Sequence, residues 1–288
     1  MRDLNFQLKQ LCERNHDGSF ATQADRERTL SLIGDQLHDL GYCHMQATSL
    51  RPKHVEALAA KWNDEGLAAG TIKNRMAALR WWAEKVNKVN VVARTNDRYG
   101  VPDRVLVDNV SKGKDVLPEQ LARITDVFTA MALRLQAAFG LRREESIKIR
   151  PDWADRGDVL VLKDSWTKGG RAREIPIRSS EQRALIDEAK RVAGKGSLIP
   201  ADMTYKDQLQ RLKSQCRMAG INNVHGHRHF YAQERYKELT GWECPARGGP
   251  SARQLTAEQK VVDRAARLTI SAELGHEREQ ITAVYLGR

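Results

Sequence analysis

The sequence has 288 residues, of which 41% are hydrophobic and 30% charged, and its formal net charge is +11 at pH 7. This length suffices for one large or two ordinary domains, each with its own core. No run of about 18 apolar residues predicts a membrane span, and the first residues lack the apolar core of a signal peptide. We therefore expect a cytoplasmic protein with no membrane partner. The cysteines Cys12, Cys43, Cys216 and Cys244 form no Cys-x-x-Cys pair, so they indicate neither a disulfide framework nor a zinc site.

The positive charge is concentrated in the second part of the chain. Residues 1–110 contain 16 Lys and Arg against 14 Asp and Glu, whereas residues 111–288 contain 32 against 23. Such an excess favours a polyanionic partner, because Lys and Arg displace the counterions that condense on nucleic acid. A basic surface that serves only solubility explains the charge alone equally well.

The first third of the chain is predicted to form helices. A helix is expected over 71–86, with Thr71 as its N-cap and a buried apolar stripe formed by Ile72, Met76, Leu79, Ala83 and Val86. Further helices are predicted over 22–40 and over 50–62, where Pro52 lies in the first turn.

Two basic residues, Lys73 and Arg80, flank the apolar stripe of the 71–86 helix and are seven positions apart. A basic flank of this kind is usually a solvated helix face. It is also a surface that can meet a DNA backbone, so both residues are candidate DNA contacts.

Between residues 90 and 113 the amphipathic pattern ends and turn-forming residues dominate, which predicts a linker between domains 1–110 and 114–288. The second domain is expected to start near Pro118 and to continue with a helix over 121–139. The best strands are 159–162 and 173–177, joined by a turn rich in Lys and Gly. With helices expected to resume to the end, the fold class is mainly α with a small antiparallel β-sheet (α+β).

The second domain carries a series of residues with phosphate chemistry. In chain order they are Arg142 after Gly140-Leu141, Lys168 in the predicted turn, His225 and Arg228 at helical spacing, His276 after Leu274-Gly275, and Tyr285 nine positions later. Each alone has an ordinary structural explanation, such as a salt bridge, an exposed turn lysine or a packed tyrosine. Together they suit one reaction, because guanidinium groups bind phosphate oxygens and surrounding cations favour the phenolate that attacks.

The order Arg, Lys, His-x-x-Arg, Gly-His, Tyr resembles the active site of the tyrosine recombinase (phage integrase) family. The resemblance implies that Arg142 and Arg228 clamp the phosphate, that Lys168 protonates the departing 5′ oxygen, and that Tyr285 is the nucleophile. By the same resemblance, His225 assists proton transfer or fixes a phosphate oxygen, and His276 donates to the scissile phosphate.

Further residues follow from the same comparison. Glu145 matches the acidic residue that supports the first arginine, and Arg171 and Arg173 are basic neighbours of Lys168 and candidate DNA contacts. The sequence departs from the family in having His227 where leucine is usual. It also has 48 residues between Arg228 and His276, part of which reads as an inserted loop over 244–250.

The resemblance implies a helical N-terminal core-binding domain and a catalytic domain that cleaves and rejoins DNA through a 3′-phosphotyrosyl intermediate. No cofactor and no metal are implied. The expected partner is double-stranded DNA with a specific attachment or core site, bound by a homo-tetramer on two duplexes, for a mobile element. The protein is expected to associate with the nucleoid.

Three alternatives remain open from the sequence. A type IB topoisomerase-like enzyme shares these residues but rejoins the same strand. A DNA-binding regulator on the same scaffold lacks the reaction altogether. The three histidines within residues 225–229 also suit a metal site, although no carboxylate or cysteine spacing supports one.

Overall fold

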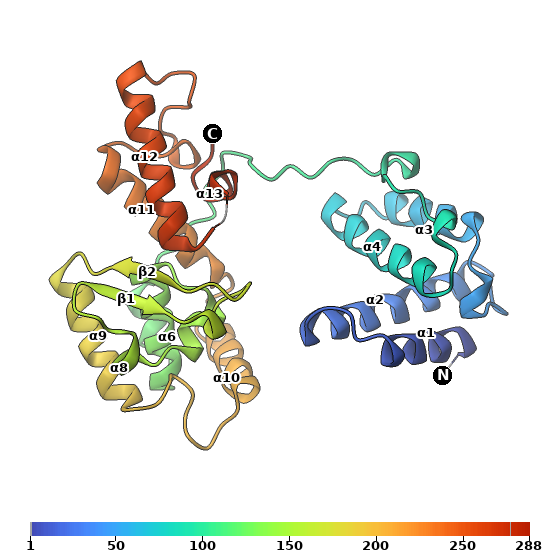
Figure 1. Ribbon diagram of the computed structural model, residues 1–288, viewed down its shortest axis with the longest axis horizontal. Helices are drawn as coiled ribbons and strands as arrows, with labels where there is room; N and C mark the ends of the chain where they lie inside the picture. The colour runs from blue at the N-terminus through green and yellow to red at the C-terminus, as the bar shows by residue number, and fades with distance from the viewer. Residues whose placement is uncertain (1, 277) are drawn as a thin grey trace. The chain divides into compact units, whose positions relative to one another are not determined.

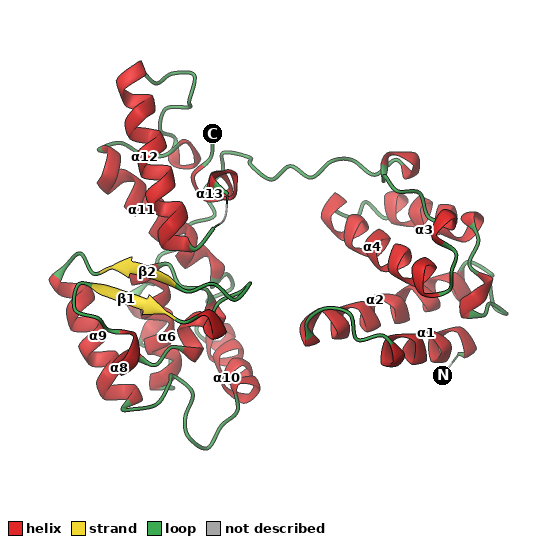
Figure 2. Ribbon diagram, in the orientation of Figure 1, coloured by secondary structure: helices red, strands yellow, loops and turns green. Residues whose placement is uncertain are grey.

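A computed structural model describes residues 2–276 and 278–288, and the chain divides into two compact units, Met1–Val105 and Leu106–Arg288 (Figure 1). The described residues are mainly helical and contain one two-stranded antiparallel sheet (Figure 2). The predicted fold class is therefore confirmed. In this part of the chain, no helix combines the length and apolar character needed to cross a membrane.

The first unit is built from four helices, α1 (Asp3–Arg14), α2 (Phe20–Asp39), α3 (Pro52–Asp64) and α4 (Ala69–Lys85). The stripe predicted on α4 is core, since Ile72, Met76, Leu79 and Ala83 are at most 1% exposed. The predicted N-cap at Thr71 is wrong. The carbonyl of Ala68 already accepts from the main-chain N–H groups of Thr71 and Ile72, so the helix starts two residues earlier.

The segment after α4 packs on the first unit instead of extending away from it. Val92, Tyr99 and Val101 are buried in the core of this unit. The hydroxyl of Tyr99 accepts from the Ala93 main chain at 2.8 Å, and the Tyr99 carbonyl accepts from Asn63 at 2.8 Å. Residues up to 101 are thus held by burial and by hydrogen bonds, although they show no amphipathic period.

The second unit contains the remaining helices and both strands. In chain order these are α5 (Pro118–Leu121), α6 (Val127–Phe139), α7 (Arg143–Lys148), α8 (Pro151–Ala154), β1 (Val159–Leu162), β2 (Arg173–Pro176), α9 (Ser180–Ala193), α10 (Tyr205–Met218), α11 (His225–Thr240), α12 (Ala257–Leu274) and α13 (Glu279–Leu286). The helix predicted over 121–139 is interrupted, because Asp126 caps a new helix by accepting from the Thr129 main chain at 2.9 Å.

The register of the sheet decides which side chains reach the interior. Leu162 pairs with Arg173 and Leu160 pairs with Ile175, and all four side chains lie on the buried face. Since side chains alternate along a strand, the buried Ile175 places Arg173 on the same inner face. The sheet therefore directs a guanidinium toward the middle of the second unit.

Helix α6 ends at Gly140, whose φ of +60° is strained for any residue with a side chain. A Cβ atom there would lie 2.5 Å from Tyr231 Cδ1 and 2.9 Å from Leu274 Cδ2. This close approach fixes the end of α6 against α11 and α12, two residues before Arg142.

We expect Gly140→Ala to lower the free energy of unfolding by about 2 to 4 kcal/mol, because backbone strain and overpacking add. Gly157→Ala is the matched control. Its φ is +80°, but the described residues leave an added Cβ nothing to meet within 4 Å, so only the backbone cost of about 1 kcal/mol remains. Urea unfolding measures both variants, and equal losses would contradict the packing argument.

Candidate active site

Tyr285 lies on α13 and is only 6% exposed. Its hydroxyl lies 3.3 Å from Nε of Arg228 and 3.4 Å from Nε2 of His225. Because Arg228 can only donate, the hydroxyl accepts from the guanidinium. The direction of its contact with His225 Nε2 depends on which ring nitrogen of His225 carries the proton. The aromatic ring is packed against His229, with ring centroids 4.4 Å apart, and against His276 at 5.2 Å.

Arg228, on the first turns of α11, is 1% exposed and fixed by main-chain oxygens. Its terminal nitrogens donate to the carbonyls of Gly140 and Leu274, and one of them also contacts Nε2 of His276 at 3.2 Å. Burial lowers the pKa of Arg228 to about 10, which still leaves the guanidinium charged at neutral pH.

Two of the three histidines beside Tyr285, His225 and His276, have pKa values below the ordinary range. Burial, and then the positive charges of Arg228 and Arg142, lower the pKa of His276 to about 3 and lower that of His225 as well. His276 Nε2 faces a donor on Arg228, so it carries a lone pair, and Nδ1 donates to Thr282 Oγ1 at 3.3 Å. Nε2 of His225, which contacts the Tyr285 hydroxyl, is an acceptor in the tautomer that carries its proton on Nδ1.

Arg142, at the start of α7, is paired with Glu145. Its main-chain N–H donates to one Glu145 oxygen at 2.6 Å and its guanidinium to the other at 2.7 Å, while its side chain remains 23% exposed. Burial alone would raise the pKa of Glu145, but hydrogen bonds and charge from Arg173 and Arg142 lower it to about 2. Glu145 is thus an ionised carboxylate between two arginines.

The structure does not place Arg173 where a DNA contact requires it. Its guanidinium is buried, donates to both Glu145 oxygens at 2.9 and 2.7 Å, and donates through Nε to the Glu273 carbonyl at 2.9 Å. The strand alternation that places Ile175 in the core turns Arg173 inward too. Arg173 therefore belongs to the support of Arg142 and not to an exposed DNA surface.

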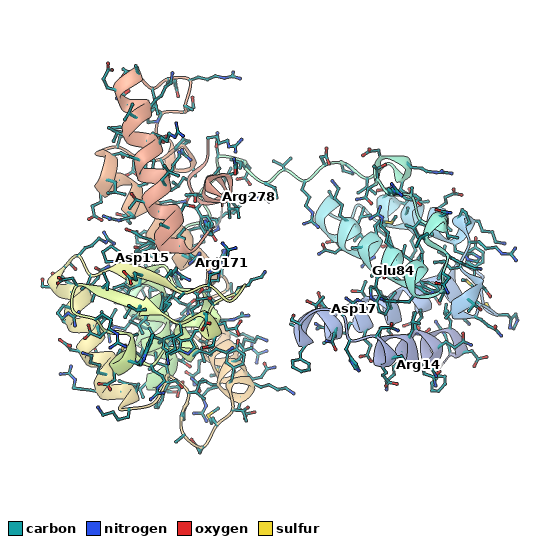
Figure 3. The ribbon with its side chains drawn as sticks, viewed as in Figure 1. Arg14, Asp17, Glu84, Asp115, Arg171 and Arg278 are labelled. Carbon is teal, nitrogen blue, oxygen red and sulfur yellow. The ribbon has the colours of Figure 1, made fainter. Side chains whose placement is uncertain are left out.

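Lys168 lies in the exposed turn between the strands, followed by Gly169 and Gly170, which both have positive φ. Arg171 is exposed in the same connection (Figure 3). The turn is closed by Thr167, whose hydroxyl bonds to both the main-chain N–H and the carbonyl of Arg171. Lys168 is therefore displayed on a closed turn, and no hydrogen bond between described residues joins its ammonium to the Tyr285 cluster.

The two candidate contacts on α4 have different environments. Lys73 pairs at 2.7 Å with Asp103, whose side chain is 98% exposed, so a phosphate can replace this partner. Arg80 donates to the Ala93 carbonyl at 2.9 Å and to Asn96 at 2.5 Å. Arg80 thus holds the segment after α4 in place, which does not fit the predicted DNA contact.

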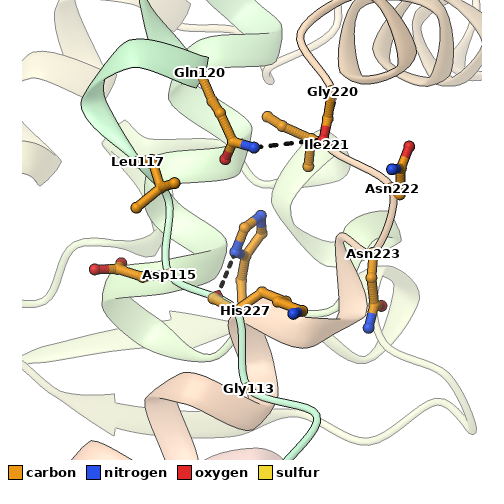
Figure 4. A pocket seen from close by; sticks show the side chains of 10 residues that line it. Gly113, Asp115, Leu117, Gln120, Gly220, Ile221, Asn222, Asn223 and His227 are labelled. Carbon is orange, nitrogen blue, oxygen red and sulfur yellow. Dashed lines mark hydrogen bonds between the residues drawn. The ribbon is translucent and has the colours of Figure 1, made fainter.

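His227 points away from the Tyr285 cluster. Its ring is 1% exposed, Nδ1 donates to the Lys114 carbonyl at 2.8 Å, and Nε2 has no hydrogen-bond partner within the described residues. The ring borders a pocket of about 440 Å³ between residues 113–120 and 220–223 (Figure 4). In the described ranges, no three side chains of the metal-binding types converge.

Sequence reasoning did not assign Thr282 and His229, which complete the cluster, and it assigned Arg173 to DNA contact instead of to the support of Arg142. His276 precedes α13 and Thr282 lies within it, so no helical periodicity indicates their contact. His229 was part of the noted histidine run, yet its stacking on Tyr285 depends on where α13 docks. For Arg173, the alternation with Ile175 was the available signal.

Two family models match the sequence. One, described as phage integrase, N-terminal, matches residues 1–91, and the other, described as integrase, matches residues 111–234. The chain therefore belongs to the tyrosine recombinase (phage integrase) family of site-specific DNA recombinases. No curated protein sequence matches it significantly.

Several solved structures share the fold. The λ integrase (75–356) dimer bound to a COC′ core site is 12% identical with a TM-score of 0.62, and the match covers 99% of this chain and 96% of that one. The XerH recombinase bound to a palindromic difH substrate is 13% identical, with a TM-score of 0.61 and coverage of 99% and 81%. The Tn1549 transposon integrase (aa 82–397) in complex with circular intermediate DNA is 14% identical, with a TM-score of 0.56 and coverage of 100% and 96%.

We expect the free energy of unfolding to fall between pH 6.5 and pH 5. Burial is the largest cause that lowers the pKa of His229 to about 4 and that of His276 to about 3. An unfolded chain, in which histidine has a pKa of about 6.5, binds more protons in this range, so acid favours unfolding. Carboxylates such as Glu145 lose their contribution only at lower pH.

His229→Phe keeps a ring against Tyr285 but removes one of these titrations. Urea unfolding at the two pH values should therefore give a smaller difference for the variant than for the wild type. An unchanged difference would show that His229 does not stay neutral in the folded protein.

Proposed function

We propose that this recombinase cleaves and rejoins DNA through a 3′-phosphotyrosyl intermediate formed on Tyr285. The observation that carries the proposal is the position of the Tyr285 hydroxyl between Nε of the Arg228 guanidinium and Nε2 of His225. A guanidinium at this distance favours phenolate oxygen, and an imidazole lone pair can receive the phenolic proton.

The proposed cleavage step forms one bond to phosphorus and breaks another. The Tyr285 oxygen bonds to the scissile phosphorus, its proton moves to His225 Nε2, and the bond from phosphorus to the 5′ oxygen breaks. The departing 5′ oxygen takes a proton from Lys168. Attack by a 5′ hydroxyl on the phosphotyrosine reverses the sequence, and the bond energy kept in the phosphotyrosine removes the need for a nucleotide cofactor.

Arg142 and Arg228 are proposed to hold the non-bridging phosphate oxygens. The Arg142 side chain is partly exposed, and Glu145 accepts one hydrogen bond from its guanidinium and another from its main-chain N–H. Preorganised donors of this kind stabilise the charge that grows on phosphoryl oxygens, because they need no reorganisation during the reaction. His276 Nε2 would become a third donor once a phosphate displaces its contact with Arg228.

The proposed oligomeric state, DNA site and mobile-element context are inferred from the structures of relatives. Solved structures of λ integrase include a dimer bound to a core site and a tetramer bound to a Holliday junction, and another relative is the integrase of the Tn1549 transposon. We propose that this chain also acts as a tetramer on two duplexes with a specific site, within a mobile element. The excess of Lys and Arg in residues 111–288, with Lys73 and Arg171, would supply the contacts to the DNA backbone.

The nucleophile is tested with Tyr285→Phe, which keeps the ring and removes the attacking oxygen. We expect DNA affinity to change little and the covalent adduct on a nicked suicide substrate to disappear. Tyr205→Phe, at the start of α10, is the matched control and should form adduct normally. A protease-resistant adduct with Tyr285→Phe would exclude this residue as nucleophile.

Relaxation by the wild-type chain of a supercoiled plasmid that lacks a specific site would indicate a topoisomerase.

The general acid is tested with Lys168→Ala, which should slow cleavage about a hundredfold, a common contribution of proton transfer. A substrate with sulfur in place of the 5′ oxygen has a better leaving group and should restore most of this loss. Lys163→Ala, the other lysine of the connection, stacked on Trp153 at 4.1 Å, should cleave both substrates normally. If sulfur fails to rescue Lys168→Ala, Arg171 is the next candidate for the acid.

A further inference from the structure

The main chain around Tyr285 is held by side chains from outside its own helix. The last carbonyls of a helix lack partners within it. Here the Tyr285 carbonyl accepts from Gln233 Nε2 at 3.0 Å, and the Gly287 carbonyl accepts from Arg267 at 2.9 Å. Asn109 then bonds to both the N–H and the carbonyl of Arg288, at 2.8 and 3.0 Å.

Residues 109–114, which we call the strap, are the part of the chain that arrives from the first unit and lies along α11. Ser111 Oγ donates to Gln233 Oε1 at 2.9 Å. Three residues later, the Lys114 N–H donates to the Gly226 carbonyl at 3.0 Å and the Lys114 carbonyl accepts from His227. The strap thus follows α11 from Gln233 back to the helical turn that carries His225 and Arg228.

The fit between the strap and α11 requires small residues. A Cβ at Gly113 would lie 2.6 Å from Gln233 Oε1 and 3.3 Å from the Phe230 main chain. A Cβ at Gly226 would lie 2.7 Å from the Lys114 side chain. Such contacts favour glycine on both sides, so the strap is seated closely and not merely adjacent.

Gln233 joins the strap to the nucleophile. Its side chain is 1% exposed, and its one amide group uses the oxygen for Ser111 and the nitrogen for the Tyr285 carbonyl. Rotation of the amide would break the bond to the Tyr285 carbonyl, because the amide oxygen cannot donate, and it would reverse the bond to Ser111. The position of the strap and the position of the Tyr285 main chain are therefore coupled through one buried group.

We propose that Gln233 is a positioning residue through which the strap holds Tyr285 in place for attack. The proposal rests on the proposed role of Tyr285 as nucleophile. A displacement of about 1 Å at a reacting atom can cost a large factor in rate, so release of the Tyr285 carbonyl should slow cleavage without weakening DNA binding. It also implies that any displacement of the strap, which follows the first unit in the chain, changes the reactivity of Tyr285.

The test compares Gln233→Ala, Ser111→Ala and the matched control Gln208→Ala in the full chain. Gln208 is also a fully buried glutamine, but it bonds to Asp126 and Thr129. At saturating DNA we expect adduct formation to slow about tenfold in Gln233→Ala and about threefold in Ser111→Ala, sizes that fit the loss of one neutral hydrogen bond. The affinity of both strap variants for DNA should stay within about twofold of the wild-type value. Gln208→Ala should lose thermal stability but keep the wild-type rate of adduct formation.

A second measurement does not depend on the reaction. Without DNA, amide hydrogen exchange over residues 281–288 should be faster in Gln233→Ala and Ser111→Ala than in Gln208→Ala. Unchanged exchange in both strap variants, or equal effects in all three variants, would overturn the proposal. If the wild-type chain formed no adduct while exchange responded as expected, the proposed function would fail and the strap contact would stand.

Discussion

The second unit depends on the burial of Arg228. A guanidinium removed from water needs strong hydrogen-bond partners, and here they are the carbonyls of Gly140 and Leu274. These oxygens lie at the C-terminal ends of α6 and α12, where helix dipoles place partial negative charge. One side chain on α11 therefore joins two helix ends and, through Nε, the Tyr285 hydroxyl on α13.

This choice of partners has an electrostatic consequence. Carbonyls satisfy the hydrogen bonds of Arg228 without cancelling its charge, whereas the ionised Glu145 is shared between Arg142 and Arg173. The cluster thus keeps net positive charge in a buried setting. The low pKa values of His225 and His276 express this excess, since their second cause after burial is repulsion from Arg228. Perturbed titrations of this kind gather at functional sites.

The order of the residues in the sequence predicted much of the site, but contacts that depend on how the helices pack against one another were not predictable. His225 and Arg228 share a helical face by spacing alone, and the strands were found because alternation and turn residues are local signals. Thr71 failed as an N-cap because a carbonyl one turn earlier started the helix. The roles of Arg173 and His227 could not be predicted for another reason. Both are buried polar side chains, and the direction of Arg173 depends on the strand register while that of His227 depends on its bond to Lys114.

The buried cations and the histidines with lowered pKa values leave the site without a balancing negative charge. His276 Nε2 accepts from Arg228, and the Tyr285 hydroxyl contacts His225 Nε2, so both of these imidazole nitrogens already have a neighbour. A phosphodiester between Arg142 and Arg228 would supply the missing negative charge and take over the Arg228 contact that now faces His276 Nε2. The charges that lower the histidine pKa values would then be balanced, so His276 could hold a proton on Nε2 and His225 could accept one from Tyr285. Substrate binding would in this way convert a site at rest into one arranged for proton transfer, with no change required in the fold.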